Sequence, residues 1–272
     1  MQPQHDSREV ILAFFDVLGF ADRVANGEAP ALFSKYRLLA ERLRHLSSTA
    51  YSHWLPRAPE FIDGETGKFD VEGLARRLRS GIPVEWVPAA TIGDVGDITT
   101  LHFSDTIMFW AKNSVARSGE FIDIAIDFFC QALEMEIPLR GAITIGDLIH
   151  DQDNMIVIGK ALVEAAEAES AQAWCGIGFG PSMRGRTIIA PDDRVLSFAA
   201  HIKPGREADV LTTSIDWTWH WRTRHPDLDL ADVAATFGNH PYWSPTLDFA
   251  RLSAASDHQG HLPIFDLGEI GA

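Results

Sequence analysis

Cysteine is scarce in this sequence. Only Cys130 and Cys175 occur among its 272 residues. They lack the close pairing that is typical of zinc sites, and two cysteines are too few for the disulfide framework of a small secreted domain. We therefore expect both to be small core residues rather than a disulfide or a metal site.

Long apolar runs are also absent. No uninterrupted run approaches the roughly 20 residues that span a bilayer. The first eight residues, Met1-Gln-Pro-Gln-His-Asp-Ser-Arg8, lack the basic segment and apolar region of a secretion signal. The sequence therefore predicts a cytoplasmic protein with no membrane partner.

Basic residues are few relative to acidic ones, with 23 Lys and Arg against 38 Asp and Glu and a formal net charge of −15. Binding to a nucleic-acid polymer depends on clustered Lys and Arg, so this balance argues against such a partner. It does not exclude a nucleotide, because a small site can hold its own metal ions and a few basic residues.

Several enzyme motifs are missing. The sequence has no Gly-x-x-x-x-Gly-Lys-Ser/Thr loop, no Gly-x-Ser-x-Gly elbow and no His-Glu-x-x-His helix. The commoner nucleotide hydrolases, serine hydrolases and zinc proteases are thereby excluded.

What the chain does contain is enough apolar sequence for one large domain. The apolar pattern predicts a buried strand at 9–17, a helix at 31–47, a hairpin at 97–112, a helix at 119–135, two short strands separated by a glycine within 138–150, a helix at 159–171 and a strand at 174–179. This order predicts an α+β or α/β sheet with its helices mostly on one face.

Two regions fall outside this pattern. Residues 54–94 are rich in Pro and Gly around a short charged helix near 71–80, and are typical of an insertion. In the last seventy residues, Trp217, Trp219 and Trp221 alternate as in a strand, but the later Trp243 and nearby prolines favour an extension packed on the same domain. Core packing is the expected role of these tryptophans.

Two aspartates lie in apolar segments. Asp16 stands within residues 10–20 and Asp105 within residues 101–110, so each is expected to be buried or nearly so. An unpaired carboxylate taken out of water costs several kcal/mol or takes up a proton. A divalent metal would meet the need for a partner.

Four motifs occur along the chain in the following order: Phe14-Phe-Asp16-Val-Leu-Gly19-Phe20, Phe103-Ser-Asp105, Arg140-Gly-Ala-Ile-Thr-Ile-Gly146 and Ile158-Gly159-Lys160-Ala161. Over about residues 9–180 the chain resembles the class III nucleotidyl cyclases. The first three segments look most like the pyrimidine cyclases of the bacterial antiphage system called Pycsar.

The resemblance implies a cyclase-like α/β sandwich with a mixed, mainly antiparallel sheet flanked by helices. It implies a catalytic domain over residues 1–200 and an extension over 201–272. It also implies that Asp16 and Asp105, with the carbonyl of Val17, hold two Mg²⁺ or Mn²⁺ ions about 3.5–4 Å apart. One ion would lower the pKa of the ribose 3′-hydroxyl, and the other would neutralise the triphosphate while the 3′-oxygen attacks the α-phosphorus.

The loop after the first strand is a candidate nucleotide-binding segment, with Phe15 before it. Gly19 would let the N–H groups of Leu18, Gly19 and Phe20 donate to the phosphates, although a simple strand-ending turn is the alternative. Lys160, after Gly159, would assist a phosphate or would simply be solvated.

Arg140 at the start of a strand either pairs with an acid or reaches a substrate phosphate as a catalytic residue.

The chain departs from the family pattern in the helix after Gly159. Counted from Gly159, the positions that typically hold a ribose-orienting Asn and a transition-state Arg hold Val163 and Glu167. Either other residues do this work or the reaction has been lost. Glu164 and Glu169 on the same helix are expected to be solvated.

The resemblance implies conversion of UTP, before CTP, to a 3′,5′-cyclic monophosphate by a homodimer with shared active sites. The product would be a second messenger read by a separate effector protein. An adenylyl or guanylyl cyclase and a catalytically silent nucleotide-binding module remain as alternatives. The sequence does not identify the residues that read the base; Tyr51 is one candidate for stacking on it.

Overall fold

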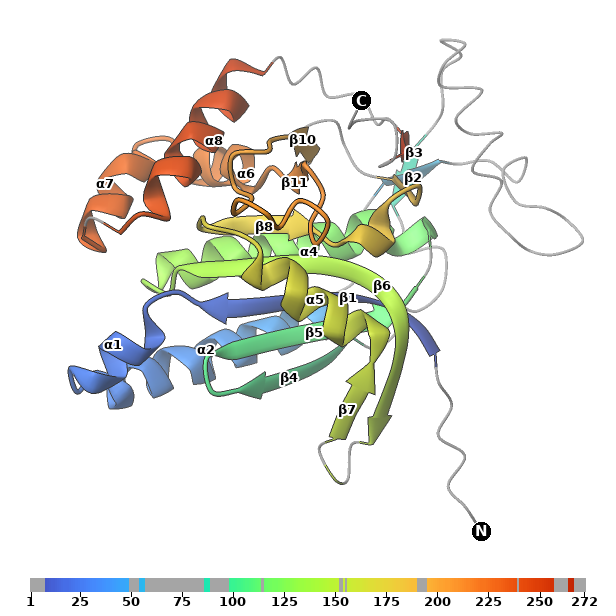
Figure 1. Cartoon of the computed structure of the whole chain (residues 1–272), viewed down its shortest axis with the longest axis horizontal. Helices are drawn as coiled ribbons and strands as arrows, with labels where there is room; N and C mark the ends of the chain where they lie inside the picture. Colours follow the sequence, from blue (N-terminus) through green and yellow to red (C-terminus); the bar gives the residue numbers. More distant parts are fainter. Residues whose placement is uncertain are drawn as a thin grey trace, which may run out of the picture.

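The computed structural model of the chain describes residues 8–48, 54–56, 86–88, 98–113, 115–151, 154, 156–189, 195–238, 240–256 and 264–266. One mixed sheet organises these residues (Figure 1). Its strands are β1 (Arg8–Val17), β4 (Thr99–Phe103), β5 (Thr106–Lys112), β6 (Leu139–Asp151), β7 (Ile156–Gly159), β8 (Gly176–Phe179), β10 (Val195–Ser197) and β11 (Thr213–Ile215).

The strands follow the order β10, β11, β8, β6, β1, β5, β4, and β7 pairs with the second half of β6. β6 and β8 run parallel, and the other pairs in this sheet run antiparallel. The prediction of a mixed, mainly antiparallel α+β sheet flanked by helices is confirmed. β1 lies in the middle because its near-continuous apolar run can be buried on both faces.

The helices are α1 (Phe20–Ala25), α2 (Ala29–Ser48), α4 (Val115–Glu134), α5 (Lys160–Ser170), α6 (Trp217–Arg224), α7 (Leu230–Thr236) and α8 (Trp243–Ala255), with a short 3₁₀ turn at Pro181–Met183. The helices expected at 31–47, 119–135 and 159–171 are confirmed. The short helix α1 was not predicted; it begins directly after Gly19.

Helices cover both faces of the sheet. Alternate residues of β1, including Phe15, pack into the core with α2 and α4. The intervening residues Val10 and Leu12 pack against Ala161 and Ala165 of α5. Figure 1 shows α5 and α4 on opposite sides of the sheet. The expectation that the helices lie mostly on one face therefore holds for α2, α4, α6, α7 and α8, whose buried residues share one core cluster. α5 is the exception, because its Ala-rich stripe allows a close approach to the second face.

β6 differs from its prediction. Residues 139–151 form one 13-residue strand that runs through Gly146 without a break. Its antiparallel partner β7 comes later, at 156–159. Gly146 does not form a turn. It lets α5 pack closely on β6, since a Cβ at this position would lie 3.0 Å from the backbone nitrogen of Ala161.

The C-terminal part continues the same fold. β11 joins the main sheet beside β8, and α6 packs on α4. Trp217 and Trp221 are buried in α6 and Trp243 in α8, so the expected core packing is confirmed and the strand-like reading of residues 217–221 is wrong. Asp216 begins α6 by accepting a hydrogen bond from the Trp219 N–H at 3.0 Å.

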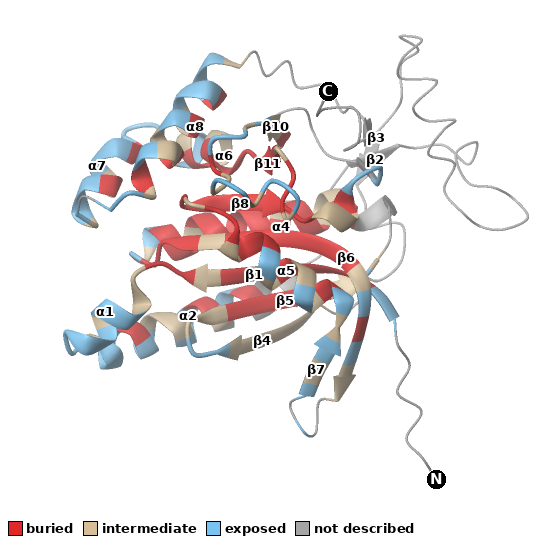
Figure 2. Ribbon diagram, viewed as in Figure 1, coloured by how far each residue is buried: buried red, intermediate tan, exposed pale blue. Residues whose placement is uncertain are grey.

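Burial is concentrated in the sheet and the helices against it, whereas α1 and α7 are largely exposed (Figure 2). Cys130 and Cys175 are buried free thiols, as predicted. None of the helices in the described part of the chain is both long enough and apolar enough to cross a membrane.

Four short strands form two further pairs: β2 (Trp54–Pro56) with β3 (Trp86–Pro88), and β9 (Thr187–Ile189) with β12 (Ile264–Asp266). β2 and β3 lie within the expected insertion. The helix expected near 71–80 lies outside the described residues, as does Tyr51.

Candidate functional site

The sheet brings Asp16 and Asp105 together. Asp16 is the penultimate residue of β1 and pairs with Thr106, the first residue of β5. Asp105 occupies the two-residue turn between β4 and β5, where Ser104 has a positive φ of 54°. The Val17 N–H donates to the Asp105 carbonyl at 3.0 Å, which fixes this turn against the end of β1.

The two carboxyl groups are close enough to share a proton. The pKa of Asp16 is raised to about 7, mainly by burial and then by the negative charges of Glu169 and Asp105. A hydrogen bond between the Asp16 and Asp105 carboxyls acts in the same direction, while Arg140 opposes it. Asp16 is partly exposed, with 26% of its side chain accessible. Two such carboxylates need a proton or a cation between them.

Arg140 lies opposite Asp16 on β6 and pairs with acids. Its Nη2 lies 3.7 Å from Asp16 Oδ2, its Nε donates to the Glu169 carboxylate, and its Nη1 donates to the Gln172 carbonyl at 3.1 Å. The structure thus favours the acid-pairing alternative for this residue. Arg140 is held on three sides and positions the Asp16 carboxylate.

Glu169 is a site residue that the sequence interpretation missed. It is buried, not solvated as expected, and burial raises its pKa despite the opposing effect of Arg140. The signal was present in the sequence: Glu169 lies eight residues after Ala161 and four after Ala165, on the buried stripe of α5. Glu164 is not simply solvated either, since its Oε1 accepts from the Ser182 N–H at 2.6 Å.

The loop after β1 is only partly available to a ligand. Gly19 has a left-handed φ of 74° and begins α1, so the chain turns sharply there. The Leu18 N–H already donates to the Pro138 carbonyl at 3.0 Å, which removes it from the expected set of phosphate donors. No described backbone carbonyl accepts from the N–H groups of Gly19 or Phe20.

Phe15 does not reach the site with its side chain. Its ring is fully buried and packs 5.3 Å from the ring of Phe128, centroid to centroid. The residue faces α4 because side chains alternate along β1, and Asp16 therefore faces α5. Its expected contact with a nucleotide is corrected on this ground.

Lys160 lies far from the aspartates of its own chain. Gly159 pairs with Leu148, whereas Asp16 pairs with Arg140, eight residues away along β6. That separation is roughly 25 Å at about 3.3 Å per strand residue. Lys160 is exposed there, and so are Val163 and Glu167 farther along α5.

A different lysine lies near the cluster. Lys203 Nζ donates to the Ser170 carbonyl at the end of α5 at 2.7 Å. Burial and the nearby Arg140 lower its pKa, while Glu169 acts in the opposite direction. Lys203 therefore adds a positive charge beside the Arg140–Glu169 pair, and it comes from the C-terminal part of the chain.

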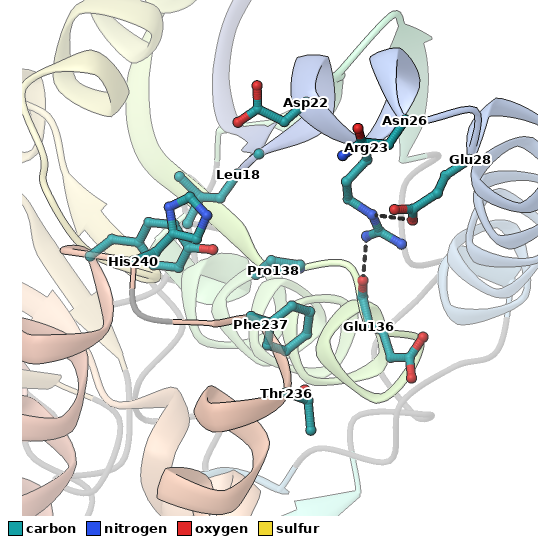
Figure 3. Close-up of a pocket in the computed structure, with 12 residues that line it drawn as sticks. Leu18, Asp22, Arg23, Asn26, Glu28, Glu136, Pro138, Thr236, Phe237 and His240 are labelled. Atoms are coloured by element: carbon teal, nitrogen blue, oxygen red, sulfur yellow. Dashed lines mark hydrogen bonds and ion pairs between the residues drawn. The ribbon is translucent and has the colours of Figure 1, made fainter.

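A cavity of about 370 Å³ adjoins the same loop (Figure 3). It lies between α1 and the turn from α7 to α8, and it is lined by Leu18, Gly19, Asp22, Arg23, Asn26, Glu28, Glu136, Pro138, Thr236, Phe237, His240 and Tyr242. Arg23 donates to Glu28 at 2.8 Å and to the Glu136 carbonyl at 2.7 Å, as the dashed lines show. Neither aspartate lines this cavity, so we place it outside the candidate site.

His150 has a structural role, with its ring edge-on to Trp110 at a centroid distance of 5.1 Å.

Within the described residues, no three His, Cys, Asp or Glu side chains are grouped so that they could hold a metal ion. A cation at Asp16 and Asp105 would therefore take its other ligands from backbone, water or substrate.

Comparisons with solved structures find class III cyclases. The guanylyl cyclase Cya2 is 8% identical, covers 65% of this chain and 76% of its own, and has a TM-score of 0.38. The adenylyl cyclase CyaB from P. aeruginosa is 12% identical, covers 65% and 78%, and has a TM-score of 0.35. A bacterial light-regulated adenylyl cyclase is 10% identical, covers 93% and 59%, and has a TM-score of 0.40. No protein-family model and no curated protein matches the chain.

Proposed function

We propose that this protein is a nucleotidyl cyclase, which converts a nucleoside triphosphate to its 3′,5′-cyclic monophosphate and pyrophosphate. The observation that carries the proposal is the contact between the Asp16 and Asp105 carboxyls at adjoining strand ends, with the pKa of Asp16 raised to about 7. A divalent cation would replace the shared proton and relieve the repulsion between the carboxylates.

The donor atoms suit Mg²⁺ or Mn²⁺. Both ions prefer oxygen ligands, and Mg²⁺ in nucleotide enzymes commonly uses one or two carboxylates together with waters and substrate phosphates. Asp16, Asp105 and the Val17 carbonyl would supply the protein ligands. Two bound cations would lower the pKa of the 3′-hydroxyl and offset the charge of the phosphates.

The remaining site residues orient the Asp16 carboxylate or interact with the negatively charged substrate. Glu169 and the Gln172 carbonyl hold Arg140, which keeps the Asp16 carboxylate aimed at the Asp105 turn. The N–H groups of Gly19 and Phe20 can donate to phosphate oxygens. Lys203 supplies a positive charge on the side of the cluster that faces α5.

The preference for UTP before CTP rests on the resemblance of the Asp16, Asp105 and Arg140 segments to the Pycsar pyrimidine cyclases. In that role the cyclic pyrimidine nucleotide is a second messenger in antiphage defence, and a separate effector protein reads it. A cytidylate, adenylyl or guanylyl cyclase would share the metal chemistry and differ in the base pocket.

A homodimer with shared sites completes the proposal. Lys160, Val163 and Glu167 are exposed on α5, and Lys160 lies far from the aspartates of its own chain. Any contribution from Lys160 to a nucleotide at Asp16 would have to come from a second copy. The proposed division into a catalytic domain over 1–200 and an extension over 201–272 includes Lys203 of the extension in the same site.

The test is an incubation of purified protein with Mn²⁺ and UTP, CTP, ATP or GTP in separate reactions, followed by mass spectrometry of the products. A cyclic pyrimidine nucleotide that disappears with Asp16→Asn would support the full proposal. A cyclic purine nucleotide would keep the activity and overturn the specificity. No product from any of the four would overturn the activity.

Asp105→Asn should leave a folded protein without turnover. An amide oxygen is a poorer ligand for a hard cation and leaves the metal charge uncompensated. We expect product formation to fall at least 100-fold while the circular dichroism spectrum is unchanged, by analogy with the cost of removing a key electrostatic group. Wild-type rates in this variant would remove Asp105 from the mechanism.

A catalytically silent nucleotide-binding module is the second candidate. Val163 and Glu167 favour it, because they stand where the resemblance expects an Asn and an Arg. This candidate predicts that Mn²⁺ and a nucleotide together raise the melting temperature without any product. Detection of a cyclic product would exclude it.

A further inference from the structure

Phe103 is the most exposed of the large apolar side chains in the described part of the chain, with 76% of it accessible. It is the last residue of β4 and directly precedes the turn that carries Asp105. Single apolar residues are common on protein surfaces, so exposure alone assigns no role to this ring. Its position on the sheet relative to Asp16 gives the stronger argument.

The strand register places Phe103 on the same face of the sheet as Asp16. Phe103 pairs with Thr106 across the hairpin, and Thr106 pairs with Asp16 on β1. Paired residues of antiparallel strands point to the same face of a sheet, so these three side chains form one row. Neighbouring strands lie about 4.8 Å apart, which puts the Cα atoms of Phe103 and Asp16 roughly 10 Å apart.

Packing in the same strands agrees with this assignment of faces. Leu101, two residues before Phe103, packs in the cluster that includes Ala161 of α5. Phe14, two residues before Asp16, packs in the same cluster. Because residues two apart along a strand share a face, Phe103 and Asp16 both lie on the face that α5 partly covers.

The row is occupied on one side of Asp16 and open on the other. On the β6 side lies Arg140, whose guanidinium is held by Glu169 and by the Gln172 carbonyl. On the other side the row ends with Phe103, because β4 is the last strand in the sheet order. A ligand that is bound at Asp16 and extends along this row therefore extends toward Phe103.

A nucleotide has the shape that this arrangement requires. Its base is separated from its phosphates by one sugar, so a triphosphate bound through cations at Asp16 and Asp105 can place its base over the Phe103 ring. Stacking requires only two π faces and therefore tolerates any of the four bases. It also removes from water an apolar ring that is otherwise exposed.

We propose that Phe103 is a substrate-binding residue whose ring is a stacking platform for the base of the nucleotide. This inference rests on the proposed nucleotide site at Asp16 and Asp105, and it adds the side of the sheet on which the base lies. The platform contributes affinity for nucleotides in general. Recognition of a particular base belongs to other residues.

The experiment measures binding without turnover. Protein with Mn²⁺ is titrated by calorimetry with the 3′-deoxy forms of UTP, CTP, ATP and GTP, which lack the attacking hydroxyl and cannot be cyclised. Inorganic triphosphate, which has neither base nor sugar, is the ligand control. Wild type is compared with Phe103→Ala, Phe103→Leu and Phe103→Trp. Phe33→Ala, at a similarly exposed phenylalanine of α2, is the protein control.

Phe103→Ala should bind the tightest of these nucleotides about 5- to 150-fold more weakly than wild type, the range that is typical of removing one base–aromatic stack. Its affinity for inorganic triphosphate should be unchanged. Phe103→Leu should resemble Phe103→Ala, because leucine is apolar but has no π face, whereas Phe103→Trp should retain wild-type affinity. Phe33→Ala should match wild type for every ligand.

Two results would overturn the inference alone. One is wild-type nucleotide affinity in Phe103→Ala; sedimentation velocity would then show whether the ring contacts a second copy instead. The other is an equal loss of affinity for nucleotide and for inorganic triphosphate, which would indicate damage to the phosphate end of the site.

Failure of the proposed function gives a different pattern. If wild type binds neither a nucleotide nor inorganic triphosphate, the proposed nucleotide site is wrong and the inference falls with it. A wild type that binds nucleotides with the predicted dependence on Phe103, but forms no cyclic product from the ordinary triphosphates, would support the inference and overturn the proposed activity.

Discussion

Asp16 is a residue whose charge state affects the stability of the folded protein. Its pKa is 3.8 in an ordinary environment and about 7 in the folded protein. Between these values the folded state holds a proton that the unfolded state has lost. The stability that this proton contributes is fully present below the unfolded pKa and is lost as the pH rises through about 7.

Asp16→Asn should remove this dependence in the metal-free protein. We expect the variant to gain about 1–3 kcal/mol relative to wild type between pH 5 and pH 8, an estimate reduced for the partial exposure of the carboxyl. Urea denaturation at both pH values measures the change. Asp22→Asn, at an exposed aspartate of α1, is the control. An identical difference between Asp16→Asn and wild type at the two pH values would contradict the assigned pKa.

The sequence was sufficient to single out Asp16 and Asp105, because a charged residue inside an apolar run is a local signal. It was insufficient for Lys203. The position of Lys203 beside the cluster depends on a contact between segments far apart in the chain, and lysine is ordinary in its local context. Glu169 is intermediate: its place on the Ala stripe of α5 was readable, but its partner Arg140 was not.

At the level of elements, the fit between β1 and β6 holds the aspartate in place. Gly141 lies opposite Phe15, and a Cβ there would lie 2.3 Å from Phe15 Cδ1 and 2.8 Å from the Phe14 carbonyl oxygen. Glycine is required at this position by the close approach of the ring, which fills the core between the sheet and α4.

Gly141→Ala should therefore destabilise the protein more than Gly146→Ala, where the nearest atom to an added Cβ is 3.0 Å away. Overpacking costs about 1–3 kcal/mol, and we place Gly141→Ala at the upper end of that range. Chemical denaturation compares the two variants. Because Phe15 precedes Asp16, weaker Mn²⁺ binding should accompany the loss of stability in Gly141→Ala. Equal stability of both variants would contradict the packing argument.

The helices and strands whose apolar residues follow one clear spacing were predicted well. α2 and α4 have apolar residues at three- and four-residue spacing, and β1 and β5 have the runs of buried strands. α6 was misread because Trp217, Trp219 and Trp221 alternate like a strand, while the helix buries only the first and last of them, four residues apart. Its start is set by Asp216, a capping residue that short-range hydrophobic periodicity does not register.

For the whole molecule, the sheet class and the face that carries most helices were accessible from the order of elements, but the placement of α5 on the second face was not. That placement depends on which face α5 takes when β6 and β8 become parallel neighbours, a relation between residues about 35 apart in the chain. The same relation brings the end of α5 to Arg140. The candidate site is thus a property of the completed sheet.

α5 and β7 also leave an exposed apolar surface, formed by Ile156, Ile158 and Val163. Ile158 is 64% exposed and Val163 60% exposed. An apolar group this accessible gains free energy when a partner covers it. In the proposed homodimer this surface lies at the contact between copies, since it adjoins the α5 positions that the resemblance assigns to a shared site.

Val163→Arg should separate the copies without touching the aspartates. A guanidinium forced into an apolar contact weakens association by several kcal/mol, so we expect a shift from dimer to monomer and loss of turnover. Mn²⁺ binding should persist, because Asp16 and Asp105 belong to one chain. Sedimentation velocity and Mn²⁺ calorimetry measure the two effects, and Leu252→Arg, at an exposed leucine of α8, is the control. A Val163→Arg dimer with full activity would exclude α5 from the subunit contact, whereas an active monomer would exclude a shared site.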